Sequence, residues 1–377
     1  MKQNGIDPSG GTDFQWLHTG AEALAEMLAA IAAARRSVRL EMYLIDPSPE
    51  ADRFRDALCQ ACRRGAAVQV LIDAFGSMSL PDHFWAALLA AGGQVRRFNS
   101  MGLKRFGIRD HRKILVCDDE TAIIGGVNIA AEYQGDGVAS GWRDLGLKFR
   151  GPLASELAAA SDEMFAGADL RHKPFSRLRK SVRQKTVPFA GGKLILTGPG
   201  RNNAIKLALS HDLKHARQVA IVCAYFLPPS RILRQLARLA RRGVKVQLIL
   251  PAKSDVFLSR LAAQSFYRRL LRAGVEIYEY QPQILHAKMF LIDDIVYVGS
   301  SNLDSRSLNI NYELMLHLPD PRLAAKGREI FSSIKAHSRR VELEHWRRSR
   351  NFVERIKGRL ARWVLAHLDP YIARQSS

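Results

Sequence analysis

Residues 285–294 read LHAKMFLIDD, and residues 110–119 read DHRKILVCDD. Each stretch is an apolar run closed by an Asp-Asp pair, a pattern typical of a buried strand that ends in a hairpin turn. Side chains two apart on a strand share a face, so His286 and Lys288 are expected to point the same way. The other stretch places His111 and Lys113 at the same offsets. The pattern therefore predicts two basic pairs on otherwise apolar strands.

The similarity between the two stretches extends upstream along the chain. Residues 34–45 (ARRSVRLEMYLI) resemble residues 216–227 (ARQVAIVCAYFL), and residues 61–72 (ACRRGAAVQVLI) resemble residues 239–250 (LARRGVKVQLIL). Each copy alternates strand-like and helix-like segments joined by short turns that contain Gly. This alternation predicts a duplicated α/β domain in which helices cover a sheet.

The repeats suggest a division of the chain. We expect a first α/β domain over residues 1–170, a basic linker over 171–193, a second α/β domain over 194–340 and a basic tail over 341–377. In the tail, apolar residues recur every three or four positions over 346–368, among arginines, which predicts a basic amphipathic helix. This helix either closes the second domain or docks on a membrane, and both interpretations remain open.

Composition narrows the partners. The 377 residues include 57 Lys and Arg against 36 Asp and Glu, a net charge of +21 that favours polyanions such as anionic lipid or nucleic acid. Of the four cysteines only Cys59 and Cys62 are close in sequence, and no second pair completes a zinc ribbon, so a reducing compartment is expected. We expect neither a signal peptide nor a membrane span.

Two His-x-Lys pairs favour an anionic ligand over a metal ion. A Lys ammonium two residues from each His would repel a divalent cation, so we predict no metal and no cofactor. A phosphate fits this arrangement because Lys neutralises its oxygens as a point charge. His can serve either as the nucleophile or as a proton donor near neutral pH.

Gly-containing segments follow both His-Lys stretches. Residues 125–128 read GGVN and residues 299–302 read GSSN, where Gly permits close approach of backbone to a ligand. Asn128, Ser300 and Asn302 are the candidate donors to phosphate oxygens. The copies differ here, because Gly126 occupies the position that corresponds to Ser300. The second copy is also one residue shorter between the Asp and the Gly, which predicts a tighter hairpin.

HRKILVCD and HAKMFLID fit the HxKxxxxD signature of the phospholipase D superfamily. The chain resembles bacterial cardiolipin synthases of that superfamily over roughly residues 12 to 335, including the segments GSSNLDSRS and NYEL. The resemblance implies two duplicated α/β sandwich domains related by a pseudo-twofold, with one active site at their interface. It also implies metal-independent phosphodiester chemistry through a phosphohistidine.

The resemblance also implies residue roles. His111 would be the nucleophile and His286 the acid, although the internal symmetry alone does not decide between them. Superfamily members place carboxylates that orient the two histidines at positions matching Asp144 and Glu313, and which carboxylate serves which His is left open. Asp118 and Asp293, which end the two motifs, lie in the predicted hairpin turns, so we expect them to give structural support rather than to transfer protons. The full catalytic set is His111, Lys113, Asp118, Asp144, His286, Lys288, Asp293 and Glu313.

The predicted function is a phosphatidyltransferase that makes cardiolipin from anionic phospholipid. The substrate would be phosphatidylglycerol, with phosphatidylethanolamine as a further candidate. A phospholipase D-type hydrolase or a nuclease of the same superfamily is the alternative, but the basic runs lack the interleaved aromatic residues of a strand-binding groove, so nucleic acid is not the expected partner. We expect a peripheral protein on the cytoplasmic face of the membrane. The oligomeric state does not follow from the sequence.

Overall fold

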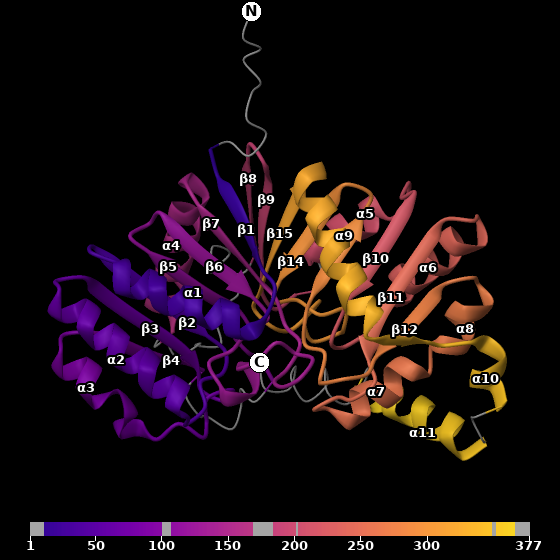
Figure 1. Cartoon of the computed structure of the whole chain (residues 1–377), viewed down its shortest axis with the longest axis horizontal. Helices are drawn as coiled ribbons and strands as arrows, with labels where there is room; N and C mark the ends of the chain where they lie inside the picture. The colour runs from indigo at the N-terminus through magenta and orange to yellow at the C-terminus, as the bar shows by residue number, and fades with distance from the viewer. Residues whose placement is uncertain (1–10, 100–106, 169–183, 201–202, 349–351, 366–377) are drawn as a thin grey trace, which may run out of the picture.

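The structure, a computed structural model, describes residues 11–99, 107–168, 184–200, 203–348 and 352–365. Two α/β halves lie side by side, with the earlier part of the chain in one and the later part in the other (Figure 1). The predicted duplicated fold is confirmed. Residues 171–183 of the predicted linker lie outside the described residues, whereas the rest of that segment enters the second sheet.

The first half is built on one sheet. Its strands are β1 (Asp13–Leu17), β2 (Ser37–Met42), β3 (Ala67–Asp73), β4 (Gln94–Phe98), β5 (Lys113–Cys117), β6 (Thr121–Gly125) and β7 (Gly146–Arg150). They are arranged in the order β1-β7-β6-β5-β2-β3-β4. Strands β2, β3 and β4 run parallel, and the other neighbouring strands are antiparallel.

The second half repeats this arrangement. Its strands are β8 (Lys185–Phe189), β9 (Gly192–Thr197), β10 (Gln218–Val222), β11 (Lys245–Pro251), β12 (Glu276–Tyr280), β13 (Met289–Ile292), β14 (Ile295–Gly299), β15 (Glu313–Pro319) and β16 (Ser338–Arg340). The order is β16-β12-β11-β10-β13-β14-β15-β9-β8, so the strands from β9 to β12 reproduce the first sheet and one strand is added at each edge.

Helices cover both faces of each sheet. In the first half they are α1 (Gly20–Ala33), α2 (Pro49–Arg63), α3 (Ala86–Ala90) and α4 (Pro152–Gly167), with single 3₁₀ turns at Asp82–Trp85 and Ala131–Tyr133. In the second half they are α5 (Ala204–Asp212), α6 (Ser230–Arg241), α7 (Phe257–Gln264), α8 (Tyr267–Arg272), α9 (Pro321–Ala336), α10 (Leu343–Arg348) and α11 (Phe352–Trp363).

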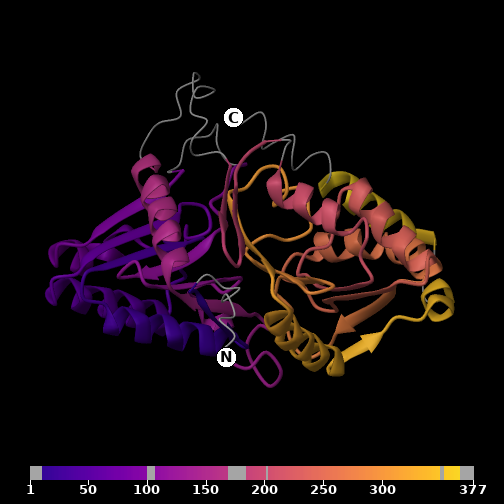
Figure 2. The ribbon, with the colours of Figure 1, turned by 90° about the horizontal axis from the view of Figure 1, so that it is seen from above.

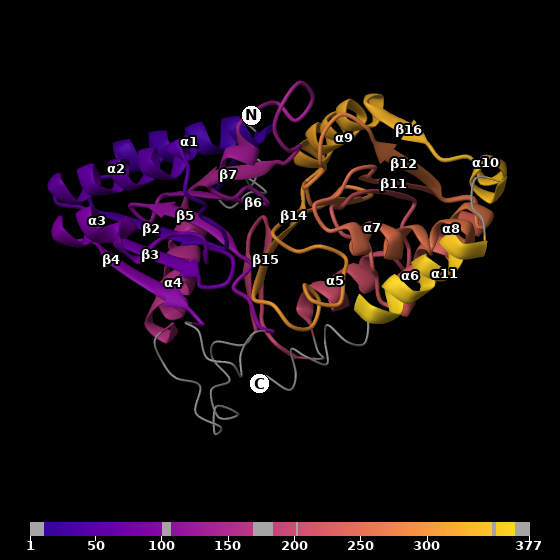
Figure 3. The ribbon, with the colours of Figure 1, turned by 90° about the horizontal axis from the view of Figure 1, so that it is seen from below.

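The halves face in opposite directions, as a pseudo-twofold requires. Helices α1 and α2 lie on one side of the first sheet and α4 on the other, whereas α9, the counterpart of α4, lies on the same side as α1 and α2 (Figures 2 and 3). One hydrophobic core spans the junction and includes Ile114 and Leu157 from the first half and Met289 and Phe331 from the second. The shared core holds the two sheets in a fixed relation.

The His-Lys segments depart from the expected strands. Strand β13 begins at Met289, after His286 and Lys288, and β5 begins at Lys113, after His111. The prediction of a strand that includes both basic residues was therefore wrong for both copies: the first strand includes Lys113 but not His111, and the second includes neither His286 nor Lys288. The reason is that these backbones leave their own sheet and pair with the other half.

The two hairpins differ in length, as predicted. Cys117 pairs with Thr121 across three turn residues in the first half, whereas Ile292 pairs with Ile295 across two in the second. The tail differs from the single predicted helix over 346–368, because the structure has two helices, α10 and α11. Residues 366–368 lie outside the described residues, and no described helix is long and apolar enough to cross a membrane.

Candidate active site

The segments that carry the two histidines cross the junction between the halves. The backbone N–H of His111 donates to the carbonyl of Tyr312 at 3.0 Å, and that of His286 donates to the carbonyl of Arg143 at 2.8 Å. Each histidine is thus anchored by main chain from the opposite half. The junction brings both basic pairs to one place. The similarity of the repeats did not reveal how the two halves would face each other.

Each imidazole is bound by a carboxylate from the other half. Nδ1 of His111 lies 3.1 Å from both carboxylate oxygens of Glu313, the first residue of β15. Nδ1 of His286 lies 2.7 Å from Oδ2 of Asp144, in the loop before β7. A proton on each Nδ1 would be donated to the carboxylate, which leaves Nε2 with its lone pair available for chemistry. The pairing left open by the sequence is therefore reciprocal in the structure.

The two lysines lie beside their own histidines. Nζ of Lys113 donates to the carbonyl of His111 at 2.7 Å, and Nζ of Lys288 donates to the carbonyl of His286. The Lys288 amine also lies 2.8 Å from Nδ1 of the His286 ring. Both lysines are fully buried, so the cluster concentrates positive charge in a site that water barely reaches. Such a site attracts a phosphate.

Burial and mutual repulsion shift the titration of the basic groups. Burial, followed by the charges of Lys113 and Lys288, lowers the pKa of His111 well below its ordinary value. Burial and Lys288 also lower the pKa of His286, which Asp144 partly offsets. Burial and the charge of Lys288 lower the pKa of Lys113 to about 7. An anionic ligand would relieve this repulsion and raise these pKa values again.

The two carboxylates differ in acidity. Burial raises the pKa of Glu313 to about 7, with Lys113 opposing the rise. Burial would also raise the pKa of Asp144, but the charges of Lys288 and His286 hold it below its ordinary value. Asp144 is therefore a permanent anion near neutral pH, whereas Glu313 exchanges a proton there. The histidines consequently have unlike partners.

The Gly126 and Ser300 positions give the two carboxylates different neighbours. The hydroxyl of Ser300 donates to the Glu313 carboxylate and accepts the N–H of Leu314 at 3.0 Å. In the first half a Cβ on Gly126 would lie 2.4 Å from Oδ1 of Asp144. A side chain at position 126 would therefore displace the carboxylate that binds His286. The difference noticed in the sequence is a steric requirement.

The two asparagines lie in the same region. Nδ2 of Asn128 donates to the Tyr133 hydroxyl at 2.7 Å, and that hydroxyl lies 3.3 Å from Nδ1 of His286. Oδ1 of Asn302 accepts the backbone N–H of Tyr225 at 3.3 Å. Both amides are buried beside the histidine cluster rather than exposed at a helix start. Their contact with phosphate stays a prediction.

Asp118 and Asp293 lie at the opposite ends of β5 and β13 from the histidines. The Asp118 carboxylate accepts the three backbone N–H groups of residues 35–37, and Asp293 accepts those of residues 217 and 218. Both residues adopt left-handed backbone angles in their turns, with φ of 56° and 50°. These contacts tie each hairpin to the start of the neighbouring strand, and their role in stability stays a prediction.

Several aromatic side chains at the site were not predicted. The rings of Tyr43 and His111 lie 4.9 Å apart, and the corresponding Tyr225 lies 6.3 Å from His286. Tyr133 and Trp142 pack on His286 at 5.6 and 5.5 Å. Tyr43 and Tyr225 occupy equivalent positions in the repeated segments EMYLI and CAYFL. Comparison of the repeats could therefore have identified them.

A buried ion cluster lies beside the first motif and was also missed. Nε of Arg112, between His111 and Lys113 in sequence, is 2.7 Å from Glu41 and 3.2 Å from Asp110. The second motif has Ala287 at this position. The sequence did carry a signal for this cluster. Glu41 is a lone carboxylate in the apolar part of its strand, and Asp110 and Arg112 flank His111.

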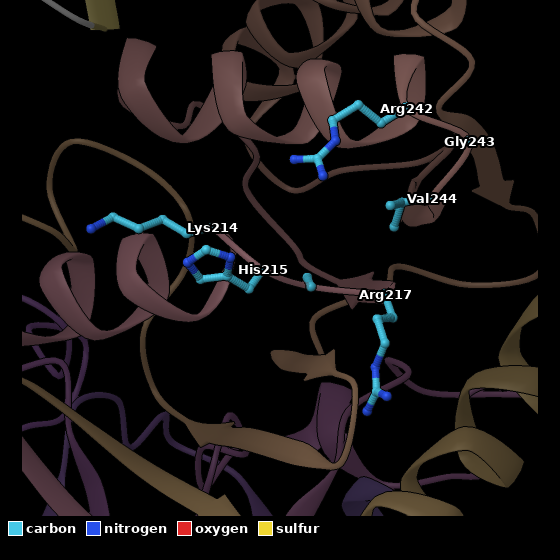
Figure 4. Close-up of a pocket in the computed structure, with 7 residues that line it drawn as sticks. Lys214, His215, Arg217, Arg242, Gly243 and Val244 are labelled. Carbon is cyan, nitrogen blue, oxygen red and sulfur yellow. The ribbon is translucent and has the colours of Figure 1, made fainter.

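A separate pocket of about 330 Å³ lies in the second half, at the strand ends opposite to those near His286 (Figure 4). It is formed where the chain enters β10 and β11, whereas His286 lies at the carboxyl end of β10. Its lining has basic groups but no carboxylate beside a histidine, so we place the candidate active site at the histidine cluster. The lining residues are Lys214, His215, Ala216, Arg217, Arg242, Gly243 and Val244.

Comparison with known proteins identifies the family of this chain. The sequence model of the family described as "Cardiolipin synthase, PLD-like domain" matches residues 27–135 and 209–335, one match in each half. The chain belongs to the phospholipase D superfamily. Each superfamily match includes one His-x-Lys pair.

Relatives of this phospholipase D-like chain match over most of its length. Cardiolipin synthase B of Salmonella typhimurium is 31% identical over 82% of this chain and 77% of the relative. Cardiolipin synthase A of Cronobacter sakazakii is 30% identical over 95% of this chain and 76% of the relative. The solved phosphatidylserine synthase of Haemophilus influenzae Rd KW20 superposes with a TM-score of 0.73 at 16% identity, covering 96% of this chain and 94% of that one. The last likeness supports the fold alone.

Proposed function

We propose that this chain is a phosphatidyltransferase that makes cardiolipin from phosphatidylglycerol by two displacements at one active site. The observation that carries the proposal is the pair of histidines, each bound to a carboxylate of the other half and each beside a buried lysine. The names of the relatives, cardiolipin synthases that match over most of their length, support the choice of substrate class.

In the first displacement, the lone pair on Nε2 of His111 attacks the phosphorus of phosphatidylglycerol. The bond from phosphorus to the glycerol headgroup breaks as the P–N bond forms, and the departing oxygen takes the proton of His286. Glycerol leaves, and the phosphatidyl group stays on His111. Splitting the transfer in this way replaces one difficult attack on a phosphodiester by two easier ones.

In the second displacement, the roles of the histidines reverse. Neutral His286 takes the proton from a hydroxyl of a second phosphatidylglycerol, whose oxygen attacks the phosphorus. The P–N bond breaks, His111 recovers its lone pair and cardiolipin is released. Water in place of the second lipid would give hydrolysis to phosphatidic acid instead.

The electrostatics favour His111 as the nucleophile. Its partner Glu313 has a pKa near 7, and the lowered pKa of His111 keeps its imidazole neutral. His286 instead faces Asp144, which stays ionised and stabilises an imidazolium. The pKa of His286 is lowered less than that of His111, because Asp144 offsets part of the fall, so His286 is the ring that more readily carries the second proton given to the leaving oxygen.

The phosphate oxygens would be bound by the buried cluster. Lys113 and Lys288 supply fixed positive charge, which stabilises the extra negative charge of the transition state without solvent reorganisation. Asn128 and Asn302 add neutral amide groups near the two histidines, and Ser300 holds Glu313. Asp118 and Asp293 would stabilise the hairpins that carry the catalytic segments.

We also propose that the protein works as a peripheral protein on the cytoplasmic face of the membrane. The net charge of +21 favours a surface of anionic phospholipid, where each juxtamembrane Lys or Arg gains about 1 kcal/mol. This attraction weakens as salt is added.

The pKa shifts predict a bell-shaped dependence of kcat/KM on pH, with both limbs near pH 7 in the free enzyme. Glu313 must be ionised to accept the Nδ1 proton, so activity falls as the pH drops through its pKa of about 7. Lys113 must be protonated to bind phosphate, so activity falls as the pH rises through its pKa of about 7. The profile is measured on a water-soluble phosphodiester.

A substitution assigns the alkaline limb. Lys113→Arg keeps a group that stays charged throughout, so the alkaline limb should disappear whatever the absolute rate. Lys148→Arg is the control and should keep both limbs. Lys148 lies on the same sheet as Lys113, in β7, and is bonded to Glu26 of α1. An alkaline limb unchanged in Lys113→Arg would show that Lys113 does not set it.

The proposed function is tested by identifying products. Purified protein is incubated in EDTA with phosphatidylglycerol, with phosphatidylethanolamine or with single-stranded DNA, and the products are identified by mass spectrometry. Cardiolipin and glycerol in equal amounts are the expected result, because each transfer releases one glycerol. The reaction should proceed in EDTA, because the lysines supply the positive charge needed at the phosphate. Phosphatidic acid alone would mean a hydrolase, cleaved DNA a nuclease, and activity only with added metal would contradict the mechanism.

A further inference from the structure

The exposed large apolar side chains are concentrated in a few places. Among the described residues, all but Leu89 and Leu207 lie on three segments: the loop after β3, the start of α7 and the outer face of α11. We call these three segments together the apolar rim. Its members are Phe75, Met78, Val256, Phe257, Leu258, Ile356, Leu360 and Trp363.

Two of these segments occupy equivalent positions in the repeats. The first follows β3 and the second follows β11, and each of these strands runs parallel to the strand whose end meets a His-Lys segment. Met42 at the end of β2 pairs with Lys113, and Val222 at the end of β10 pairs with Met289. Both apolar loops therefore leave the sheets at the strand ends where the histidines lie.

Contacts connect each loop to the site. In the first half, the hydroxyl of Ser77 donates to the carbonyl of Tyr43, whose ring packs on His111. In the second half, the hydroxyl of Tyr225 donates to Asp255 at 2.5 Å, and the Tyr225 ring packs on His286. The exposed residues Val256 and Phe257 follow Asp255 directly in the chain.

Helix α11 has an unusual orientation for a helix that closes a domain. It lies alongside α7 (Figures 1 and 3) and faces it with small residues, because Ala361 is buried and a Cβ on Gly358 would lie 3.2 Å from the Leu261 carbonyl. Ile356, Leu360 and Trp363, spaced four and three apart, face outward. The apolar stripe of a closing helix would face inward.

This orientation resolves part of the tail. Trp346 of α10 packs on Tyr267, with ring centroids 4.8 Å apart, so this end of the tail packs against the second half. The part of the tail that presents apolar groups to solvent is α11.

Basic groups flank the apolar rim. Lys357, Arg359 and Arg362 are exposed on α11, beside its apolar stripe. The guanidinium of Arg260 lies 5.3 Å from the centre of the Phe257 ring. An apolar stripe flanked by cations is typical of a surface that lies at the headgroup level of an anionic bilayer.

We propose that the apolar rim is the surface by which the protein docks on a bilayer of anionic phospholipid, with the histidine cluster facing the headgroups. Phe257 and its neighbours enter the acyl boundary on one side of the site, Phe75 and Met78 on the other, and α11 extends the contact. The proposal rests on the proposed function for its substrate. It adds the orientation in which a headgroup phosphate reaches His111 without leaving the membrane.

Binding is tested separately from turnover. Flotation with vesicles of phosphatidylglycerol and phosphatidylcholine in equal amounts measures the affinity of the wild type, Phe257→Glu and Leu360→Glu. Each substitution places a charge where an apolar side chain is buried in lipid, so we expect binding to weaken about tenfold or more. Leu207→Glu is the matched control, because Leu207 of α5 is 55% exposed and Leu360 is 57% exposed.

Turnover is then compared on two forms of one lipid. We expect Phe257→Glu and Leu360→Glu to lose about tenfold on vesicles but to match the wild type on monomeric short-chain phosphatidylglycerol, since neither residue contacts the histidines. If the wild type turns over neither form, the proposed function fails, while flotation still decides the docking surface.

Three results would overturn the docking proposal. The first is unchanged flotation of both rim variants. The second is an equal loss in Leu207→Glu, which would mean that any added negative charge weakens binding. The third is a wild-type dimer in sedimentation velocity that Leu360→Glu dissociates without weakening flotation, which would assign the rim to a second copy of the chain.

Discussion

Alanine at His111 or at His286 should lower the rate of phosphatidyl transfer by a factor of about 10³ or more, with the fold retained. The first variant loses the group that we propose forms the P–N bond, and the second loses the proton for the leaving oxygen. Steady-state production of cardiolipin, followed by mass spectrometry, measures both. His317→Ala is the matched control, because His317 is also buried and bonded to a carboxylate, Asp212 at 2.9 Å, but lies outside the cluster.

A substrate with a nitrophenol leaving group separates the two histidines. Nitrophenolate departs without a proton, so His286→Ala should regain much of the first displacement and accumulate a labelled phosphatidyl group on His111. His111→Ala should stay inactive on the same substrate. Label on His286 in the wild type would reverse the assignment, and full activity of either alanine variant on phosphatidylglycerol would refute the mechanism.

Asp144→Asn and Glu313→Gln should each lower kcat by a factor of about 10² to 10⁴, because each removes the acceptor that fixes a histidine tautomer. The two losses should respond differently to the leaving group. Asp144 stabilises protonated His286, so Asp144→Asn should recover on the nitrophenol substrate, whereas Glu313→Gln should not. Single-turnover rates on both substrates measure this difference.

Controls keep this second prediction specific. Glu132→Gln changes an exposed carboxylate in the segment before Asp144 and should leave both rates unchanged. The double variant of Asp144→Asn with His286→Ala should be no slower than His286→Ala alone, because the aspartate acts through the histidine. Additive losses would mean that Asp144 acts independently, and equal recovery of both carboxylate variants would remove the proposed division of labour.

Much of the fold followed from repeated local patterns. The paired segments ending in His-x-Lys carried the strand and helix alternation in both halves, and the shorter second hairpin was visible as one missing residue. The start of β13 was misplaced, because the backbone around His286 pairs with Arg143 of the other half. Local patterns do not report a partner that lies so far away in the chain.

The site shows the same limit. Asp144 and Glu313 were named from resemblance, but their partners depend on how the two sheets pack against each other, which no local pattern encodes. The amphipathic tail was recognisable, yet the pattern could not say that Gly358 and Ala361 would face the protein and the large apolar residues the solvent. Helical periodicity identifies an apolar stripe without identifying what covers it.

The exchange of carboxylates between the halves means that both histidine–carboxylate pairs exist only in the assembled chain. A half that folds alone has a histidine and a lysine but lacks the acceptor for its own imidazole, since Glu313 and Asp144 reside in the opposite halves from the histidines they bind. Under the proposed mechanism, the first half alone would lack the acceptor for the His111 imidazole, so we expect it to capture no phosphatidyl group. Because both acceptors depend on the packing of the two halves, mutations that loosen the shared core should impair both proposed displacements at once.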